Sequence, residues 1–139
     1  MSKVERWSER LLGYHFNDPS FLQSALTHRS AKGTNNERLE FLGDSVLQVV
    51  MSELVFEARP DATEGRLSRI RSSLVKDTTL SQIAAELGIG EHLVLGSGEK
   101  KTGGHRRASI LADAVEAIFG AVYLDAGYEE ARDIILRAY

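Results

Sequence analysis

The sequence contains no cysteine, only two prolines among 139 residues, and few aromatic side chains, at 7%. Without cysteine there are no disulfide bonds, thiolate zinc sites or cysteine nucleophiles, a composition typical of a reducing cytosol. So few prolines and aromatics disfavour an all-β sandwich with its many turns. No uncharged apolar run approaches the ~18 residues of a membrane span. These absences predict a cytoplasmic, mainly helical protein with no membrane partner.

The chain also has no excess of basic residues. It carries 17 Lys and Arg against 20 Asp and Glu, a formal net charge of −3. Since nucleic-acid-binding proteins usually have a basic surface, this balance taken alone argues against a nucleic-acid partner. The length suits one domain with one sizeable core, and 42% apolar residues are typical of a globular protein.

Apolar residues recur at helical spacing along most of the chain, between clear start and stop signals. Asp18 followed by Pro19 predicts a helix start, Thr63 predicts another, and Asp77 or Thr78 a third. Loops are expected at 27–36, where Gly33, Thr34 and two asparagines cluster, and at 96–105, which is rich in glycine and lysine. The expected helices cover 3–12, the stretch after Pro19, 37 to just before Pro60, 64–76, the stretch up to Gly88, 107–125 and 128–138. This pattern predicts one all-α domain over residues 1–139.

The helix expected from residue 37 carries acidic side chains on one side. At about 100° per residue, Glu37, Glu40 and Asp44 fall within a narrow arc, and apolar residues cover the opposite side. Further along the helix the acidic arc itself turns apolar, at Met51 and Val55. A helix that is apolar on every side is buried, so these carboxylates are expected at the exposed mouth of a buried helix.

The helix expected from residue 107 has the same design. Asp113 and Glu116 lie on the face opposite a stripe of core residues, and Gly120 follows one turn later. Glycine inside a helix costs about 1 kcal/mol relative to alanine. Gly120 therefore predicts that another backbone packs closely against this helix.

Each of the two helices thus offers a pair of neighbouring carboxylates, Glu40 with Asp44 and Asp113 with Glu116. Such pairs lie ~5–6 Å apart and repel each other, so a bound cation would stabilise them. Four carboxylates without thiol or imidazole make an oxygen-only site, which suits Mg²⁺ or Mn²⁺. Solvated acids on two amphipathic faces remain the alternative interpretation of the same spacing.

Bound cations would change the charge argument, because two divalent ions would move the formal net charge from −3 to +1. Arginines at 66, 69 and 71 share one expected helix, and basic residues surround the glycine-rich loop before residue 107. A basic loop at a helix N-terminus is a natural phosphate contact. Ordinary solvated surface is the alternative for each of these charges.

Several other motifs are excluded. The stretch GSGEKKTGG at 96–104 matches neither the P-loop nor the GxGxxG pattern. Ser30, Ser45 and Ser109 have no histidine and aspartate at informative spacing, which argues against a catalytic triad. No histidine stands three residues after Glu40, Asp44, Asp113 or Glu116, so the Glu-x-x-His repeat of di-iron bundles is absent.

The string ERLEFLGDS at 37–45 strongly resembles the signature motif of the ribonuclease III family. The similarity extends over almost the whole chain. It includes LTHRS at 26–30, EGRLSRIRSSLV at 64–75 and GSGEKKTGGHRRASILADAVEAIFGAVYLDAG at 96–127. The order of these blocks resembles the endonuclease domain of the bacterial enzymes with a single catalytic domain, as opposed to Dicer or Drosha.

The resemblance implies a homodimeric, all-α endoribonuclease that hydrolyses double-stranded RNA to 5′-phosphate and 3′-hydroxyl ends, with precursors of rRNA and mRNA as expected substrates. It implies Asp44 and Glu116 as catalytic acids, and Glu40, Asp44, Asp113 and Glu116 as ligands of Mg²⁺, for which Mn²⁺ can substitute. Two ions about 3.5–4 Å apart can activate the attacking water and neutralise the departing oxygen.

Three further residues match the family. Glu37 and Glu64 correspond to acids that support the site or its RNA contacts, although an acid in a first helical turn is also favoured by the helix dipole. Phe41 corresponds to an aromatic residue that packs across the homodimer. On the helical wheel it flanks the acidic arc, so its ring needs a partner surface or a local pocket. A two-fold dimer would cut both strands of a duplex and leave staggered ends.

The chain departs from the family in one respect, since it lacks the double-stranded-RNA-binding domain that follows in bacterial members. We expect an excised catalytic domain; a natural short form is the alternative. Few phosphate contacts then remain, which predicts weak and strongly salt-dependent RNA affinity. Two other functions stay open: a non-catalytic RNA-binding or scaffold module, and a different metal–carboxylate helical protein.

Overall fold

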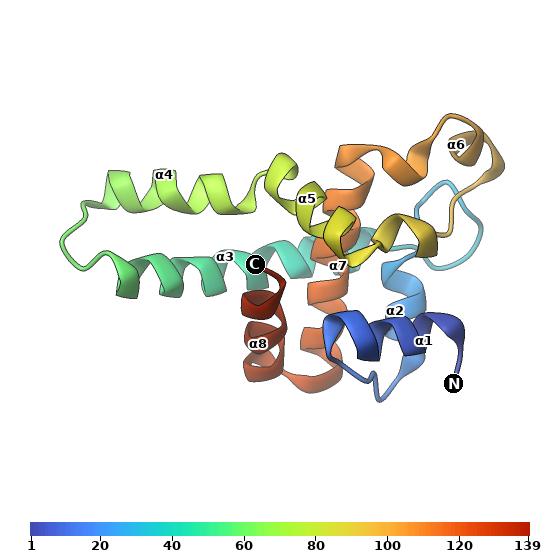
Figure 1. Cartoon of the computed structure of the whole chain (residues 1–139), viewed down its shortest axis with the longest axis horizontal. Helices are drawn as coiled ribbons and strands as arrows, with labels where there is room; N and C mark the ends of the chain where they lie inside the picture. The colour runs from blue at the N-terminus through green and yellow to red at the C-terminus, as the bar shows by residue number, and fades with distance from the viewer.

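The computed structural model describes all residues, 1–139, and confirms the all-α fold class, because it contains helices, turns and a single isolated bridge between Thr27 and Val94 (Figure 1). None of the helices is long and apolar enough to cross a membrane. The α-helices are α1 (Lys3–Trp7), α2 (Pro19–Ala25), α3 (Glu37–Ala58), α4 (Glu64–Val75), α5 (Asp77–Leu87), α6 (Ser97–Lys101), α7 (Ala108–Ala126) and α8 (Tyr128–Ala138). A π-helical turn, η1 (Ser8–Leu12), continues α1, and two 3₁₀ turns are η2 (Ile89–His92) and η3 (Gly104–Arg106).

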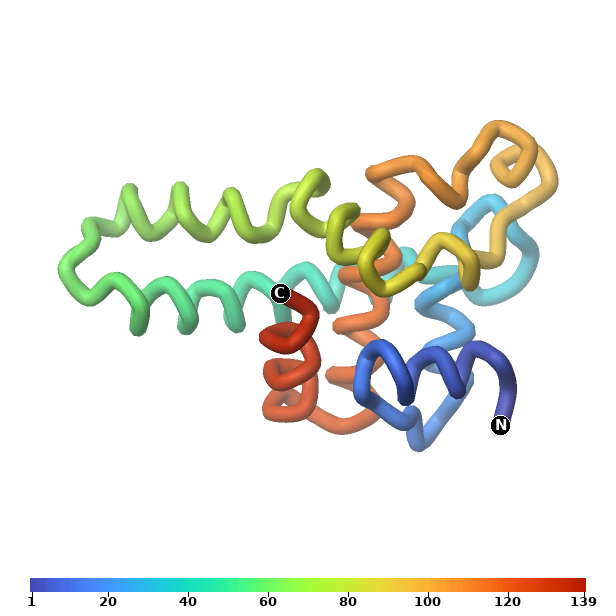
Figure 2. Tube along the Cα trace, viewed as in Figure 1, coloured from blue at the N-terminus to red at the C-terminus, as the bar shows by residue number.

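Helix α7 forms the centre of the molecule. Between Ile110 and Val122 every residue is buried except Asp113, which is half-buried. Helices α2, α3, α5 and α8 all pack against α7. Figure 2 shows these segments, from the N-terminal part of the chain to its C-terminal end, arranged around α7. A helix surrounded in this way is apolar on nearly every side, so an acidic side chain on it needs a hydrogen-bond partner, a proton or a cation beside it.

Helices α3 and α7 cross with their backbones in contact, at Gly43 and Gly120. A β-carbon at Gly43 would overlap the carbonyl oxygen of Glu116 and lie 2.9 Å from the backbone nitrogen of Gly120. A β-carbon at Gly120 would overlap the carbonyl oxygen of Leu39 and lie 3.0 Å from the backbone nitrogen of Gly43. The close approach predicted from Gly120 is therefore confirmed, and Gly43 is its counterpart on the other helix.

Beyond this crossing, α3 and α4 form an antiparallel hairpin that projects from the rest of the molecule (Figures 1 and 2). Helix α8 contacts the α3 half of this hairpin through Glu53. The Tyr128 hydroxyl of α8 donates a hydrogen bond to Glu53, and Arg132 Nε lies 3.9 Å from the same carboxylate. Helix α4 contains no fully buried residue. Its apolar side chains are only half-buried, because along most of its length α4 packs against α3 alone.

The expected helix ends are mostly confirmed. Asp18 and Thr63 each accept a hydrogen bond from a backbone N–H of the following first turn, and Gly88 ends α5 with φ +68°. The cap expected at Asp77 or Thr78 is wrong, since α5 begins at Asp77 directly after Lys76. An extended backbone at Lys76 separates α4 from α5 without a loop, so Asp77 lies in the first turn of α5.

The segment 96–105, expected to be a loop, contains the short helix α6 and the start of η3. Arg107 closes this segment, with its Nη1 2.5 Å from Glu99 Oε2. Gly104 is buried against Glu99, where a β-carbon would lie 2.7 Å from Cγ. Gly104 therefore allows tight packing in this segment. The ion pair that closes the segment, between Glu99 and Arg107, joins residues eight positions apart.

The crossing predicts a severe effect of Gly43→Ala. We expect this substitution to lower the free energy of unfolding by about 3 kcal/mol or more, at or above the usual range for overpacking, because the new methyl group meets backbone that cannot rotate away. Urea unfolding followed by circular dichroism measures the change.

Gly98→Ala in α6 is the matched control, because a β-carbon there meets nothing within 4 Å. It should leave stability unchanged or raise it by up to about 1 kcal/mol through helix propensity. Equal stability of the two variants would contradict the backbone contact.

Candidate metal centre

Four acidic side chains meet beside the crossing of α3 and α7. Glu40, Asp113 and Glu116 each offer a carboxylate oxygen, and these three atoms lie within 4.8 Å of one another. Asp44 lies beside them, close enough to Glu116 for the two carboxyls to share a hydrogen bond when one of them is protonated. Acids separated by about seventy residues of sequence thus lie side by side, as the spacing on the two helices predicted; we call these four residues the acid cluster.

The cluster is organised as two pairs that bridge the helices. Glu40 of α3 bonds to Asp113 of α7, and Asp44 of α3 bonds to Glu116 of α7. The sequence suggested pairs along each helix, whereas the pairs that can share a hydrogen bond run between the helices. The reason is the Gly43–Gly120 contact, which brings the two backbones closer together than side chains would allow.

Burial and mutual repulsion favour the protonated form of three of these acids, Glu40, Asp113 and Glu116. Burial, the hydrogen bond to Asp44 and the charge of Asp44 raise the pKa of Glu116 to about 9. Burial and the neighbouring Asp113 raise the pKa of Glu40 to about 7. Burial and the charge of Asp77 raise the pKa of Asp113, and its hydrogen bond with Glu40 opposes that increase. In the absence of a cation, protons hold the pairs together.

The donor set fits a hard divalent cation. All four groups are carboxylates, and neither a thiol nor an imidazole belongs to the cluster. Glu116, only 8% exposed, would be an unpaired buried charge without a proton or a cation beside it. Mg²⁺ and Mn²⁺ prefer oxygen ligands, and Mg²⁺ is usually held by one or two carboxylates together with substrate phosphates. The residues present therefore suit such ions.

Three charged residues surround the cluster. Glu37 is exposed, and its charge further raises the pKa of Glu40. Arg29 Nη1 lies 4.0 Å from Glu37 Oε2. Asp77 was expected to cap a helix, and Arg29 was not among the expected site residues. The charges of both act on the pKa of Asp113, but Arg29 lies in a loop and Asp77 at a helix end, positions for which helical periodicity carries no signal.

Glu64 lies apart from the acid cluster within this chain. It is the first residue of α4, at the far end of the hairpin (Figure 1). From Glu40 to the end of α3 at Ala58 the helix alone is roughly 27 Å long, at 1.5 Å per residue. The supporting role expected for Glu64 stays a prediction.

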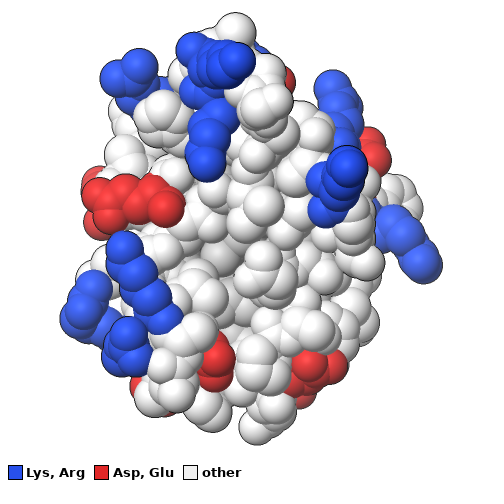
Figure 3. All heavy atoms as spheres, turned by 90° about the vertical axis from the view of Figure 1, so that its right-hand side faces the viewer, with Lys and Arg blue, Asp and Glu red and all other residues white.

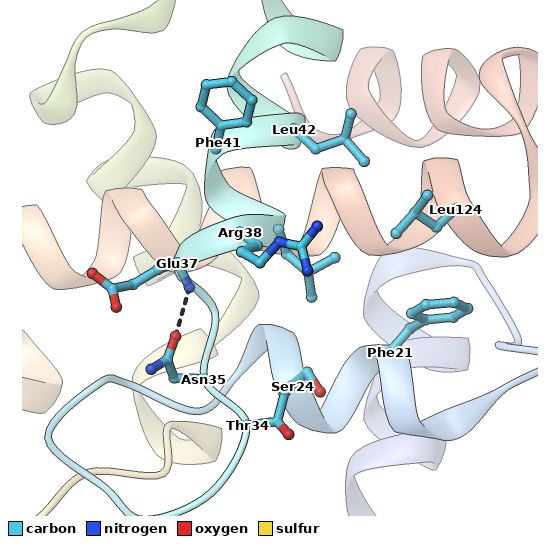
Figure 4. A pocket seen from close by; sticks show the side chains of 10 residues that line it. Phe21, Ser24, Thr34, Asn35, Glu37, Arg38, Phe41, Leu42 and Leu124 are labelled. Carbon is cyan, nitrogen blue, oxygen red and sulfur yellow. Dashed lines mark hydrogen bonds between the residues drawn. The ribbon is translucent and has the colours of Figure 1, made fainter.

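Phe41 is exposed beside a broad groove. Its side chain is 79% exposed, although phenylalanine is a large apolar residue. The groove has a volume of about 920 Å³. In Figure 4, Phe41 and Leu42 come from α3, Phe21 comes from α2 and Leu124 from α7, with Arg38 between them. An exposed ring beside a groove with apolar lining is typical of a surface that binds another protein, and the dimer role expected for Phe41 stays a prediction.

Not every acid near α7 belongs to the cluster. Asp125, near the end of α7, accepts hydrogen bonds from the Tyr14 hydroxyl at 2.5 Å and from the backbone N–H groups of Asn17 and Asp18 at 2.8 and 2.9 Å. These bonds hold its pKa below the ordinary value, although burial opposes them. Asp125 therefore has a structural role, fastening the segment before α2 to the central helix.

The chain is similar to known proteins over most of its length. Residues 18–139 match the family described as Ribonuclease-III-like. Ribonuclease 3 from Alkalilimnicola ehrlichii is 57% identical over 128 residues, which cover 92% of this chain and 56% of that protein. Ribonuclease 3 from Methylococcus capsulatus is 58% identical over 130 residues, 94% of this chain and 56% of that protein. The chain thus spans about half the length of these relatives.

Solved structures show the same fold. The nuclease domain of ribonuclease III from Campylobacter jejuni superposes with a TM-score of 0.94 at 44% identity, covering 98% of this chain and 95% of that one. That structure is described as showing flexibility in a region involved in dimer formation. Dicer from Pichia stipitis superposes with a TM-score of 0.70 at 30% identity, covering 91% of this chain and 56% of that one.

The raised pKa of Glu116 predicts how stability depends on pH in the presence of a chelator. Between its ordinary value of 4.5 and about 9, the folded state binds more protons at this group than the unfolded state does. The free energy of unfolding should therefore fall as pH rises through this window. Glu116→Gln, which stays neutral, should show a smaller fall. Urea titrations at several pH values measure both slopes, and parallel curves for the two proteins would contradict the assignment.

Proposed function

Since the chain belongs to the ribonuclease-III-like family, we propose that it is a metal-dependent endoribonuclease that hydrolyses double-stranded RNA to 5′-phosphate and 3′-hydroxyl ends. Residues 1–139 would form the catalytic domain. The observation that carries this proposal is the meeting of four carboxylates beside a backbone crossing. Cytoplasmic processing of rRNA and mRNA precursors is proposed from the resemblance to the bacterial enzymes.

Glu40, Asp44, Asp113 and Glu116 would hold the divalent ions, Mg²⁺ or in its place Mn²⁺. Such ions, when bound, supply Lewis acidity toward the phosphodiester and neutralise the leaving 3′ oxygen. The protein contributes geometry, because the rigid crossing of α3 and α7 holds the oxygens in place before substrate arrives. We assign the most essential roles to Asp44, which is exposed, and to Glu116, which is buried.

Glu40 and Glu116 must lose their protons when a divalent ion binds to their carboxylates. Because the pKa values of Glu40 and Glu116 lie near or above neutrality, ions and protons compete for the same oxygens. Ion affinity and activity should therefore both rise with pH. Glu37 and Glu64 are proposed as supporting acids outside the ligand set.

The charge distribution supports a modest affinity for RNA. On the face that carries α1, α6 and the loop at 27–36, Lys and Arg side chains stand in separate groups, divided by uncharged surface and in one place by Asp and Glu side chains (Figure 3). The overall formal charge is −3. Phosphate contacts from this chain are then few, and its RNA binding should weaken steeply with salt.

We also propose a homodimer formed through the surface around Phe41. The ring lies beside a groove lined by Phe21, Leu42 and Leu124, so a two-fold related copy could insert its own Phe41 there. One acid cluster in each protomer would then cut one strand each, and the two-fold relation fits a duplex whose backbones are read by shape.

The catalytic proposal predicts cleavage of long duplex RNA by the wild-type protein with Mg²⁺ at low salt. Glu116→Gln and Asp44→Asn should each reduce the rate by ~10²-fold or more, since even outer-shell groups of metal sites contribute 10–100-fold. Glu86→Gln, at an exposed acid on α5, is the matched control and should cut normally. Duplex binding without cleavage by the wild type would favour the non-catalytic RNA-binding module instead.

The dimer proposal predicts that Phe41→Asp makes the protein monomeric. The substitution removes the apolar contact of the ring and would bury an aspartate in the partner's groove, where the one arginine that lines it, Arg38, offsets only part of the desolvation cost, so association should be lost. Sedimentation equilibrium measures the change, and Leu11→Ala, at another partly exposed apolar residue, is the control. A Phe41→Asp protein that sediments as the wild type does would rule out this interface.

A further inference from the structure

The loop ahead of α3 is fastened to the segment ahead of α6 by backbone hydrogen bonds. The N–H of His28 donates to the carbonyl of Val94 at 2.9 Å, and the N–H of Val94 donates to the carbonyl of Leu26 at 2.8 Å. These bonds form the only β-bridge in the structure. The chain segments that lead into the two acid-bearing helices are thus joined before either helix begins.

Side chains extend this connection. Ser30 Oγ accepts a hydrogen bond from the N–H of Gly96 at 2.9 Å and lies 2.8 Å from His28 Nδ1. The backbone N–H of Ser30 donates to the same Nδ1 at 3.1 Å, so this ring nitrogen carries no proton and the serine hydroxyl donates to it as well. A β-carbon at Gly96 would overlap the carbonyl oxygen of Ser30. We call His28, Ser30 and Gly96 the clasp.

The clasp is not a catalytic dyad, although it shows that Ser30 has the histidine partner that its sequence spacing did not indicate. Both hydrogen-bonding directions of the Ser30 hydroxyl are used within the clasp. The acids assigned to the metal centre take no part in these bonds. The clasp therefore fixes the local backbone, including the backbone of the residue between His28 and Ser30.

That residue is Arg29, which stands between the two clasp side chains in sequence. Its side chain is 71% exposed, and its one ion pair, with Glu37, is long at 4.0 Å. Glu37 lies three residues before Glu40 in α3, so the two acids are neighbours on one face of the helix and the ion pair places the guanidinium beside the acid cluster. Arg29 is thus a cation held at the edge of the cluster with donors free for a ligand.

We propose, on the basis of the function proposed above, that Arg29 binds a phosphate of the duplex RNA at the acid cluster and that the clasp is the positioning device for it. A guanidinium presents a planar fork of donors that matches phosphate oxygens. A cluster of carboxylates alone repels the RNA backbone, and a cation at its edge offsets that repulsion. Fixing the backbone on both sides of Arg29 reduces the entropy lost when RNA binds.

The competing explanation is that Arg29 only offsets the charge of the acids. The two roles differ in what Arg29→Ala changes. A phosphate contact affects the KM for RNA and its dependence on salt, whereas a simple counter-charge affects the binding of Mn²⁺ in the absence of RNA. Arg29→Lys keeps the charge and loses the planar fork, which separates charge from geometry.

The experiment measures kcat and KM for duplex RNA with Mg²⁺ at several salt concentrations. Arg29→Ala should raise KM several-fold with little change in kcat, and should lower the slope of log affinity against log salt by about 1. Ser30→Ala should shift KM in the same direction, and Ser30→Thr, which keeps the hydroxyl, should restore it. In the Arg29→Ala background, Ser30→Ala should add nothing. Arg10→Ala, at an exposed arginine of η1, is the control.

Three results would overturn the inference: unchanged KM and salt slope in Arg29→Ala, a change confined to Mn²⁺ affinity, or additive effects of the Arg29 and Ser30 substitutions. Melting temperatures of all variants show whether each is folded. Failure of the wild-type protein to cut or bind duplex RNA would instead contradict the proposed function, so the two failures are distinguishable.

Discussion

The contact between the backbones of α3 and α7 at Gly43 and Gly120 is the constraint on which the rest of the structure depends. With no side chains between them, the helices approach closely enough for Glu40 to reach Asp113 and for Asp44 to reach Glu116. A larger residue at either glycine would move the helices apart and separate the pairs. The fold and the candidate site therefore depend on the same few atoms.

The crossing also brings together groups that destabilise one another. Repelling, partly buried carboxylates are tolerated because α7 is surrounded by apolar side chains along almost its whole length. Protons reduce the repulsion when no cation is present, and a divalent ion would replace them. In this way the apolar core supports a strained, acidic centre that is suited to binding a cation.

Local signals predicted most of the helices, because periodicity, caps and glycine stops act within a few residues. Gly120 also indicated the close approach, since a glycine inside a buried helix is otherwise unfavourable. The role of Gly43 was not predicted, because it directly precedes an acidic residue, and a glycine beside exposed polar residues does not by itself indicate a close backbone contact. Bonds across the helices, the clasp at Ser30 and the role of Asp77 depend on the crossing angle and on contacts between distant segments, which spacing along one helix does not report.

The most direct test of the account is a calorimetric titration of the RNA-free protein with Mn²⁺ near pH 8, for the wild type and for Glu116→Gln. The account predicts binding and a raised melting temperature for the wild type, because an ion that binds only the folded state stabilises it. It predicts that both are strongly weakened in Glu116→Gln. A wild-type protein that binds no Mn²⁺, or two proteins that bind it equally well, would contradict the claim that the crossing builds a metal centre.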